Sequence, residues 1–211
     1  MCFHSKQSKD AQTVEKRFNA EVKDVTSFNQ LSEFNGYTFP KTPIITNESI
    51  NEIQMYHWGL IPDWSKDDSI KQFTLNARIE TIKEKPSFKN YLNNRCLVIA
   101  DGFYEWKWLD NKGKRKQKHL IKLPNEDLYA YAGIFSKWIN EESGEIINTY
   151  SIITTIANDV VSEIHRKKRM PIILHPEDEN KWLSGDSIEK YQLPYQVELI
   201  AENIENQQML F

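Results

Sequence analysis

The second residue of the chain, Cys2, could do chemistry that an internal cysteine cannot. Cysteine is small enough for methionine aminopeptidase to remove Met1, which would leave an α-amine beside the thiol. Such an aminothiol forms a Schiff base with an aldehyde and then closes a five-membered thiazolidine through its sulfur. An α-amine has an ordinary pKa of about 7.7–8.0, so part of it is neutral and nucleophilic at physiological pH. A cysteine near a terminus can also be an incidental thiol, and position alone does not decide between the two.

Two further side chains could transfer protons. Glu105 lies among aromatic residues in the segment 101–106, where burial would raise its pKa toward the range of a general acid or base. His165 lies at the end of a predicted helix, where the helix dipole favours the protonated imidazole, and four basic residues follow it. Structural interpretations stay open for both: an exposed strand residue for Glu105 and a solvated basic loop around His165.

A third set of residues is suited to nucleic acid. Asn76 could orient a substrate by hydrogen bonding, and Arg78 could bind a phosphate through its guanidinium fork. Trp58 and Trp64 flank a loop that contains glycine and proline, and such rings stack well on unpaired bases. Arg169 ends a basic run that could form a phosphate-binding rim. Each of these residues could instead serve packing or the solvated surface, which is also the preferred interpretation of the basic segment 112–118.

The composition excludes several classes of protein. The 211 residues suffice for a single domain, 1–211, with a real core. A net charge of -3 excludes a uniformly basic surface but allows a local basic groove. The apolar runs are too short to span a membrane, and no signal peptide is present. Two cysteines predict no disulfide framework, and the start of the chain lacks the further ligand pair of a zinc site. We therefore expect a cytoplasmic monomer without membrane, metal or cofactor.

Hydrophobic periodicity predicts an α+β fold with a mainly antiparallel, barrel-like sheet and peripheral helices. The prediction rests on the many expected strands joined by short turns. Closing such a sheet into a barrel would leave no strand edge unpaired. The expected elements are a helix over 8–22; strands over 43–46 and 50–58; a loop over 59–69; a short helix over 87–92; a strand over 95–109 bent at 101–102; a strand over 118–123; a hairpin of 128–138 and 149–155; a helix from 158 to 164; a strand over 171–174; and a helix over 176–183.

Taken together, these segments resemble one family, the SRAP (SOS-response-associated peptidase-like) or abasic-site processing proteins. The resemblance runs in order from residue 1 to about 175. It rests on Met1-Cys2, WGLIPDW at 58–64, NARIET at 76–81, RCLVIADGFYEW at 95–106, AGIF at 132–135, TTIAN at 154–158, and the IH and RMPIIL pieces of 164–174.

The resemblance implies a role for each matching residue. Cys2 would be the nucleophile that closes a thiazolidine on the abasic sugar, and Asn76 would hold the opened sugar and the N-terminal residue. Glu105 would move protons during ring opening and Schiff-base chemistry, while His165 would assist at the sugar hydroxyl and in reversal. The phosphate-binding and base-facing residues would be Arg78, Arg169, Trp58 and Trp64. The implied fold is a mainly antiparallel β barrel-like core with peripheral helices.

Two departures from the family pattern are evident. Members commonly begin Cys-Gly-Arg, whereas Phe3 and His4 follow Cys2 here, so an arginine contact to DNA is missing and Lys6 is one candidate to replace it. The stretch 166–168 also lengthens the spacing between His165 and the Met-Pro pair, which weakens the assignment of Arg169.

The function expected from the sequence is covalent capture of abasic sites in single-stranded DNA by Cys2, at damaged DNA in the nucleoid, with lyase activity accessible from the Schiff base. Two alternatives stay open. The first is a thiol peptidase that cleaves its own Met1-Cys2 bond or other peptides, with Cys2 as nucleophile and His165 as base. The second is a non-catalytic single-stranded DNA-binding module that uses the tryptophan loop and the basic run.

Overall fold

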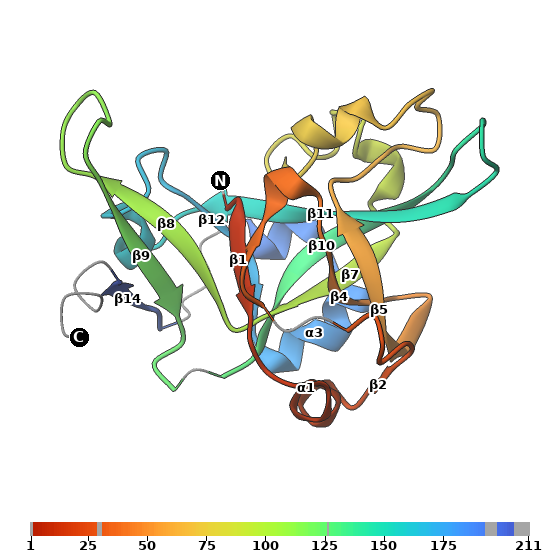
Figure 1. Cartoon of the computed structure of the whole chain (residues 1–211), viewed down its shortest axis with the longest axis horizontal. Coiled ribbons are helices and arrows are strands. Elements are labelled where there is room, and N and C mark those ends of the chain that lie inside the picture. Colours follow the sequence, from red (N-terminus) through yellow and green to blue (C-terminus); the bar gives the residue numbers. More distant parts are fainter. Residues whose placement is uncertain (1, 29–30, 126, 193–197, 205–211) are drawn as a thin grey trace.

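A computed structural model describes residues 2–28, 31–125, 127–192 and 198–204 of the chain (Figure 1). Its strands are β1 (His4–Gln7), β2 (Glu21–Val22), β3 (Leu31–Asn35), β4 (Lys41–Thr46), β5 (Ser49–Trp58), β6 (Asn76–Arg78), β7 (Arg95–Ala100), β8 (Gly102–Trp108), β9 (Lys116–Lys122), β10 (Tyr129–Ile139), β11 (Ile146–Ile156), β12 (Arg169–Pro171), β13 (Ile173–Leu174) and β14 (Ile200–Asn203). Its helices are α1 (Ala11–Phe18), α2 (Asp159–Ser162) and α3 (Pro176–Leu183), with short 3-10 turns η1 (Gly36–Thr38), η2 (Ser69–Phe73), η3 (Lys89–Tyr91) and η4 (Ile188–Tyr191).

Five strands close into a barrel. The order β11–β10–β7–β4–β5 is antiparallel throughout, and β5 then pairs with β11 in parallel to complete the ring. Closure removes the strand edges that an open sheet would expose. The predicted α+β fold with a mainly antiparallel, barrel-like core is therefore confirmed.

A second sheet stands beside the barrel, in the order β14–β9–β8–β1–β3 (Figure 1). The chain passes from the barrel to this sheet at Asp101, between β7 and β8. The predicted interruption at 101–102 is thus real, but it separates two strands of different sheets and does not bulge one strand. The β8–β9 hairpin extends away from the barrel, at the upper left of Figure 1.

The barrel strands β7 and β10 are buried on both faces over most of their length. In β10, the aromatic rings of Tyr129, Tyr131 and Phe135 point to one core cluster, and the small alanines between them face another that packs under α1 and α3. This alternation follows from the two-residue repeat of a strand. Gly133 lies on the aromatic side, where a Cβ atom would come within 2.8 Å of the sulfur of Cys96. The cluster on the aromatic side also contains Cys2.

The helices differ from the prediction mainly in length. The helix predicted over 8–22 is α1 alone, because Asn19 adopts a left-handed conformation and Glu21–Val22 then forms β2. The segment 87–92 makes only a 3-10 turn. At α2, the N-cap Asn158 accepts a hydrogen bond from the amide of Val161, and the helix ends at Ser162, two residues before the predicted end. Helix α3 has its predicted bounds.

Candidate functional site

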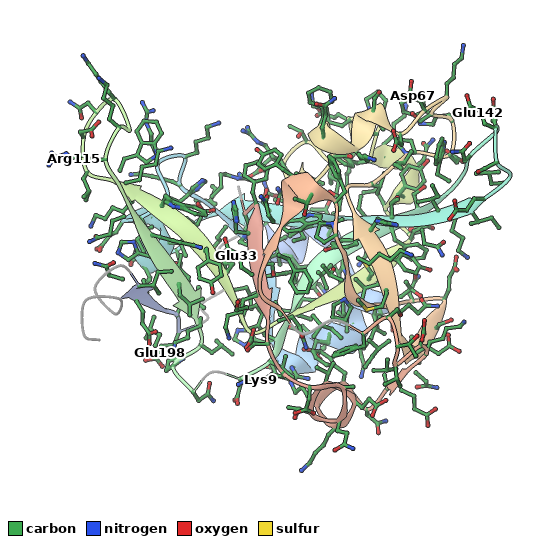
Figure 2. All side chains as sticks on the ribbon, in the orientation of Figure 1. Lys9, Glu33, Asp67, Arg115, Glu142 and Glu198 are labelled. Carbon is green, nitrogen blue, oxygen red and sulfur yellow. The ribbon has the colours of Figure 1, made fainter. Side chains whose placement is uncertain are left out.

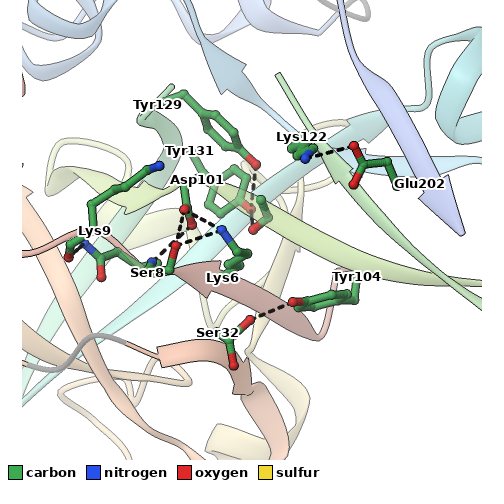
Figure 3. A network of polar contacts seen from close by, with 12 residues as sticks. Lys6, Ser8, Lys9, Ser32, Asp101, Tyr104, Lys122, Tyr129, Tyr131 and Glu202 are labelled. Carbon is green, nitrogen blue, oxygen red and sulfur yellow. Dashed lines mark hydrogen bonds and ion pairs between the residues drawn. The ribbon is translucent and has the colours of Figure 1, made fainter. Parts of the chain in front are cut away.

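Strand β1, which follows Cys2, is fixed by a buried carboxylate. Asp101 is fully buried and accepts hydrogen bonds from the ammonium of Lys6 at 2.6 Å and the hydroxyl of Ser8 at 2.6 Å (Figure 3). Its backbone amide donates to the carbonyl of Lys6 at 3.0 Å. Because Lys6 is held in this way, it is not a free cation that could replace the missing arginine after Cys2, and that suggestion is wrong.

Nearby tyrosines extend the same network. The hydroxyl of Tyr131 donates to the carbonyl of Gly102 at 3.1 Å and lies 3.3 Å from the hydroxyl of Tyr129 (Figure 3). At the bend between the two sheets, the carboxylate of Asp101 and the carbonyl of Gly102 thus both have hydrogen-bond donors, as buried polar groups require. The start of the chain is thus attached to a rigid junction of the two sheets.

Asn76 holds the backbone of Cys2. The asparagine begins β6, whose parallel pairing with β11 places it opposite Ile152. Its amide nitrogen donates to the carbonyl of Cys2 at 2.8 Å. Its amide oxygen is buried and has no hydrogen-bond partner among the described residues. The oxygen is thus an acceptor that a substrate or an amine can use.

The thiol of Cys2 is buried beneath this contact. It donates to the carbonyl of His4, with 3.6 Å between sulfur and oxygen. Burial, aided by the charge of Glu105, raises the pKa of the thiol well above its usual value. The sulfur is accordingly protonated at neutral pH, so an amine at this position would be the better first nucleophile.

Glu105 lies on β8 with its carboxyl group almost entirely buried. Burial raises its pKa from the ordinary value of 4.5 to about 7. A carboxyl group with this pKa exchanges protons readily in both directions near neutral pH. The environment therefore matches the sequence-based expectation for a general acid or base.

His165 faces Glu105 from the turn after α2. Its Nε2 lies 3.8 Å from the carboxylate oxygen of Glu105, and its Nδ1 accepts a hydrogen bond from the amide of Arg169 at 3.0 Å. Since Nδ1 accepts, the neutral ring carries its proton on Nε2, toward Glu105. Burial lowers the pKa of His165 to about 4, so the expected stabilisation of its cation by a helix dipole is wrong: α2 ends before His165, and burial outweighs the dipole.

Glu105 and His165 line one cavity of about 440 Å³, which Phe3, the residue after Cys2, also lines. Its remaining walls come from the N-terminal segment, the β8–β9 hairpin and the basic run after His165. The full lining is Phe3, Glu105, Trp106, Trp108, Lys116, His165, Arg166 and Lys167. The structure thus brings together the four residues predicted to be catalytic: Cys2 with Asn76 by contact, and Glu105 with His165 by proximity.

The two predicted phosphate-binding arginines differ. Arg78 is exposed at the end of β6, two residues after Asn76. Arg169 is buried, and its guanidinium makes two hydrogen bonds to Glu80 and one, at 2.7 Å, to the carbonyl of Thr154. Arg169 therefore contributes to the site through its backbone amide, while its side chain is committed to an ion pair with the exposed Glu80 and a hydrogen bond to Thr154.

The two tryptophans of the loop also differ. Trp58 is fully buried, donates to the carbonyl of Leu75 at 2.8 Å, and lies parallel to the ring of Tyr150. A ring in this position cannot meet an unpaired base, so the assignment of Trp58 to a base-facing loop is wrong, because core packing uses the ring. Trp64 is 51% exposed and stays a candidate for stacking.

Sequence reasoning did not assign Phe3, Trp106 or Trp108 to the site, although all three line its cavity. Strand alternation could not have placed the two tryptophans there, since it puts Trp106 and Trp108 on the face of β8 opposite to Glu105. In the described part of the chain, no group of His, Cys, Asp or Glu side chains could hold a metal ion. No described helix is long and apolar enough to cross a membrane.

Comparison with known proteins defines the class to which this fold and site belong. The family model of the SOS response associated peptidases (SRAP) matches residues 1–209. The chain belongs to the SRAP family.

Its curated relatives carry more particular names. The chain is 46% identical over 142 residues to the abasic site processing protein YoqW of Bacillus subtilis. The matched region covers 67% of this chain and 61% of YoqW. It is 43% identical over 158 residues to YoaM of the same species, and 41% identical over 150 residues to HMCES of Gallus gallus, another abasic site processing protein. The match with HMCES covers 60% of this chain and 43% of that protein. The matched part spans about three fifths of the length of YoqW.

Solved structures agree with the fold. A crystal structure of a protein from Bacteroides thetaiotaomicron superposes with a TM-score of 0.89 at 35% identity, covering 99% of this chain and 94% of that one. A second, from Bordetella bronchiseptica, superposes with a TM-score of 0.80 at 23% identity over 96% of this chain and 99% of that one. The likeness to the second structure concerns the fold alone.

Proposed function

We propose that this protein captures abasic sites in single-stranded DNA through a covalent bond to Cys2 after removal of Met1. The observation that carries the proposal is the placement of a proton-transfer pair, Glu105 and His165, beside an N-terminal cysteine whose backbone Asn76 holds at 2.8 Å. The names of its curated relatives point to the same substrate. In this view the protein acts at damaged DNA in the cytoplasm and shields the abasic site from strand-cleaving enzymes.

The first step is opening of the abasic sugar, which equilibrates between a closed hemiacetal and an open aldehyde. Opening needs a proton removed from the anomeric hydroxyl and a proton given to the ring oxygen. Glu105, with a pKa of about 7, can do both in turn, and neutral His165 presents its Nε2 proton to the same space. The pair is therefore suited to raising the rate at which the aldehyde appears.

Capture then proceeds from the amine to the sulfur. The α-amine of Cys2 attacks the aldehyde carbon, a C–N bond forms, and the carbonyl oxygen leaves as water to give an imine. The thiol adds to the imine carbon, a C–S bond forms, and the thiol proton ends on the nitrogen. This order suits a thiol whose pKa is raised by burial, because the sulfur needs no prior ionisation in bulk water.

Asn76 would position both reactants. Its amide nitrogen already holds the carbonyl of Cys2, and its buried oxygen can accept from the amine or from a sugar hydroxyl. An unsatisfied buried acceptor costs free energy that a substrate donor would recover. The imine stage also permits loss of a proton from the neighbouring sugar carbon and elimination of the 3′-phosphate, so that lyase activity competes with closure of the ring.

The test mixes processed protein, whose loss of Met1 is verified by intact mass, with a single-stranded oligonucleotide that carries one abasic site. A heat-stable shifted band on a denaturing gel is expected, with a mass equal to both partners less one water. Cys2→Ala should lose this band yet give a product that borohydride traps, since its α-amine still forms an imine. Cys96→Ala, which removes the other buried thiol, should retain the stable band.

Two results would overturn the proposal. The first is no adduct from protein shown to lack Met1, and the second is a stable adduct from Cys2→Ala. Cleavage of peptides by protein that does not cross-link would favour a thiol peptidase. Salt-sensitive binding that is indifferent both to abasic sites and to Cys2 would favour a non-catalytic binder.

A further inference from the structure

The β8–β9 hairpin carries an open, positively charged surface next to the site. Residues 106–118 contain six basic residues and one acidic residue, in a chain whose net charge is -3. Figure 2 shows Arg115 near the end of this hairpin, which extends beyond the rest of the second sheet. We call the surface formed by Trp108, Lys112, Lys114, Arg115, Lys116 and Arg166 the hairpin surface. Lys112, Lys114, Arg115, Lys116 and Arg166 are exposed, and Trp108 is half-buried.

The ring of Trp108 is held in a fixed position on this surface. One face lies against the turn of the hairpin, where Gly113 has a φ of +65° and a Cβ atom would come within 2.5 Å of the ring. The guanidinium of Arg166 lies 4.3 Å from the ring centre, and the ammonium of Lys116 lies 5.2 Å from it. A ring held between a glycine turn and two cations has little conformational freedom left to lose on binding.

The only acidic residue of the segment 106–118 is used inside the turn. The carboxylate of Asp110 accepts hydrogen bonds from the backbone amides of Lys112, Lys114 and Arg115, at 2.9, 3.1 and 2.6 Å. The side chain of Arg115 also approaches Asp110 at 3.8 Å but is three quarters exposed. These hydrogen bonds fix the turn and leave the charges of the lysines and the arginine directed to solvent.

The hairpin surface is continuous with the cavity of Glu105 and His165. Trp108, Lys116 and Arg166 belong to both, so a strand that leaves the cavity on this side meets the ring and the cations at once. An aromatic ring flanked by cations matches the two components of single-stranded DNA, a base for stacking and phosphates for charge. Protein surfaces of this kind bind such strands with little regard to sequence.

We propose that the hairpin surface binds the nucleotides that flank the abasic site on one side. One base would stack on the face of Trp108 that the Arg166 guanidinium covers in the free protein, and Arg166 would move from the ring to an adjoining phosphate, which it binds together with Lys114 and Arg115. The proposal rests on the capture function proposed above and adds a second binding region to it. It accounts for a local basic surface on an acidic protein, and it predicts that the two flanks of the abasic site contribute unequally to capture.

One experiment measures the dependence of capture on each flank. Two sets of oligonucleotides keep one flank constant and lengthen the other from one to nine nucleotides, and the concentration that gives a half-maximal capture rate is determined for each. For the protein with Met1 removed, affinity should rise more steeply with the length of one flank than with the length of the other. Trp108→Ala should abolish that difference, a loss of about tenfold for one base–aromatic stack, while Trp108→Tyr should restore most of it.

A second experiment measures the charge contribution. In Lys114→Ser/Arg115→Ser, the slope of log affinity against log salt should decrease by about 1.4, because each phosphate contact on single strands contributes about 0.7. Lys16→Ser/Lys23→Ser removes the same charge from exposed positions on α1 and beside β2, and it should leave the slope unchanged.

The outcomes separate the two proposals. Equal dependence on both flanks, or a flank effect that survives Trp108→Ala, would contradict the proposed role of the hairpin surface. Neither result would contradict covalent capture. A reduction of the salt slope by the Lys16/Lys23 variant equal to that by the hairpin variant would also contradict the role of the hairpin surface. If no oligonucleotide of any length forms an adduct with processed protein, the capture function fails instead.

Discussion

Trp58 and Trp108 belong to two regions of the molecule that use the same kind of side chain in opposite ways, one for packing and one for an open surface. Trp58 is buried in the core at the end of the barrel strand β5, with its N–H donating to the carbonyl of Leu75 and its ring parallel to Tyr150. Trp108 lies on the hairpin among cations and lines an open cavity. The region that positions Asn76 and Cys2 is built for rigidity, whereas the region beyond Glu105 keeps binding groups accessible. The four predictions below test this division, beginning with the largest effect.

Replacing each tryptophan by alanine should separate stability from binding. Trp58→Ala should lower the free energy of unfolding by about 3–5 kcal/mol, because it empties a fully buried site and leaves the carbonyl of Leu75 without its donor. Trp108→Ala should lower it by less than about 1 kcal/mol, as expected for a partly exposed residue away from the core. Urea denaturation measures both. Equal losses would show that the two regions do not differ in this way.

The buried carboxyl group should dominate the chemistry. Glu105→Gln keeps the shape of the side chain but cannot accept and return a proton, so covalent capture should slow about a hundredfold while affinity for intact single strands stays the same. Glu163→Gln changes an exposed glutamate near His165 and should leave the rate unaltered. Quenched time courses on denaturing gels give the rate. Parallel losses of rate and affinity would indicate that Glu105 has a structural role.

The two arginines should differ as the two tryptophans do. Arg169→Ala removes an ion pair with the exposed Glu80 and leaves the buried carbonyl of Thr154 without its donor, so it should lower the free energy of unfolding by about 2 kcal/mol, with no change in the salt dependence of DNA binding. Arg78→Ala removes an exposed cation near Asn76 and should decrease the salt slope by about 0.7 without loss of stability. A decreased salt slope in Arg169→Ala would instead support the phosphate contact that the sequence predicts for Arg169.

The smallest effect concerns pH. Burial raises the pKa of Glu105 from 4.5 to about 7, so the folded protein keeps a proton that the unfolded chain loses, and this contribution to stability falls as pH rises through that window. Burial lowers the pKa of His165 from 6.5 to about 4, so its contribution rises with pH between those values. The two oppose each other in the unmodified protein.

Replacing Glu105 should therefore leave the pH dependence that comes from His165 unopposed. Relative to the unmodified protein, Glu105→Gln should gain about 1–2 kcal/mol of stability as pH rises from 4.5 to 7. Urea midpoints of both proteins across this range provide the measurement. A stability difference that is constant with pH would mean that Glu105 titrates as an ordinary carboxyl group.

Much of the fold follows from local patterns. The alternation of large and small residues along β10, the break at Asp101-Gly102 and the acidic first turn of α3 are all visible in the sequence. The short strand β1 was not predicted, because its buried residues, Ser5 and Gln7, are polar and give no hydrophobic signal. Closure of the barrel by β5 and β11 depends on a pairing between residues about ninety positions apart, which periodicity cannot supply.

The candidate site was predictable in its members but not in their surroundings. Cys2, Asn76, Glu105 and His165 came from motifs, and the structure brings them together. The sequence could not indicate that Trp58 is sealed in the core, since burial of a ring depends on strands far away along the chain. The pKa of His165 was misjudged for the same kind of reason, because a helix dipole is a local property whereas desolvation is set by the whole fold.

The position of β1 between β3 and β8 has a mechanical consequence for a captured strand. Cys2 lies two residues before β1, so tension that a motor protein applies to covalently bound DNA would enter this strand directly. Both edges of β1 are paired, and Lys6 is additionally tied to Asp101, so the load would be shared in shear by two neighbouring strands and an ion pair. Traction on the DNA would therefore be resisted by the sheet as a whole, and would not peel a loose terminus away from it.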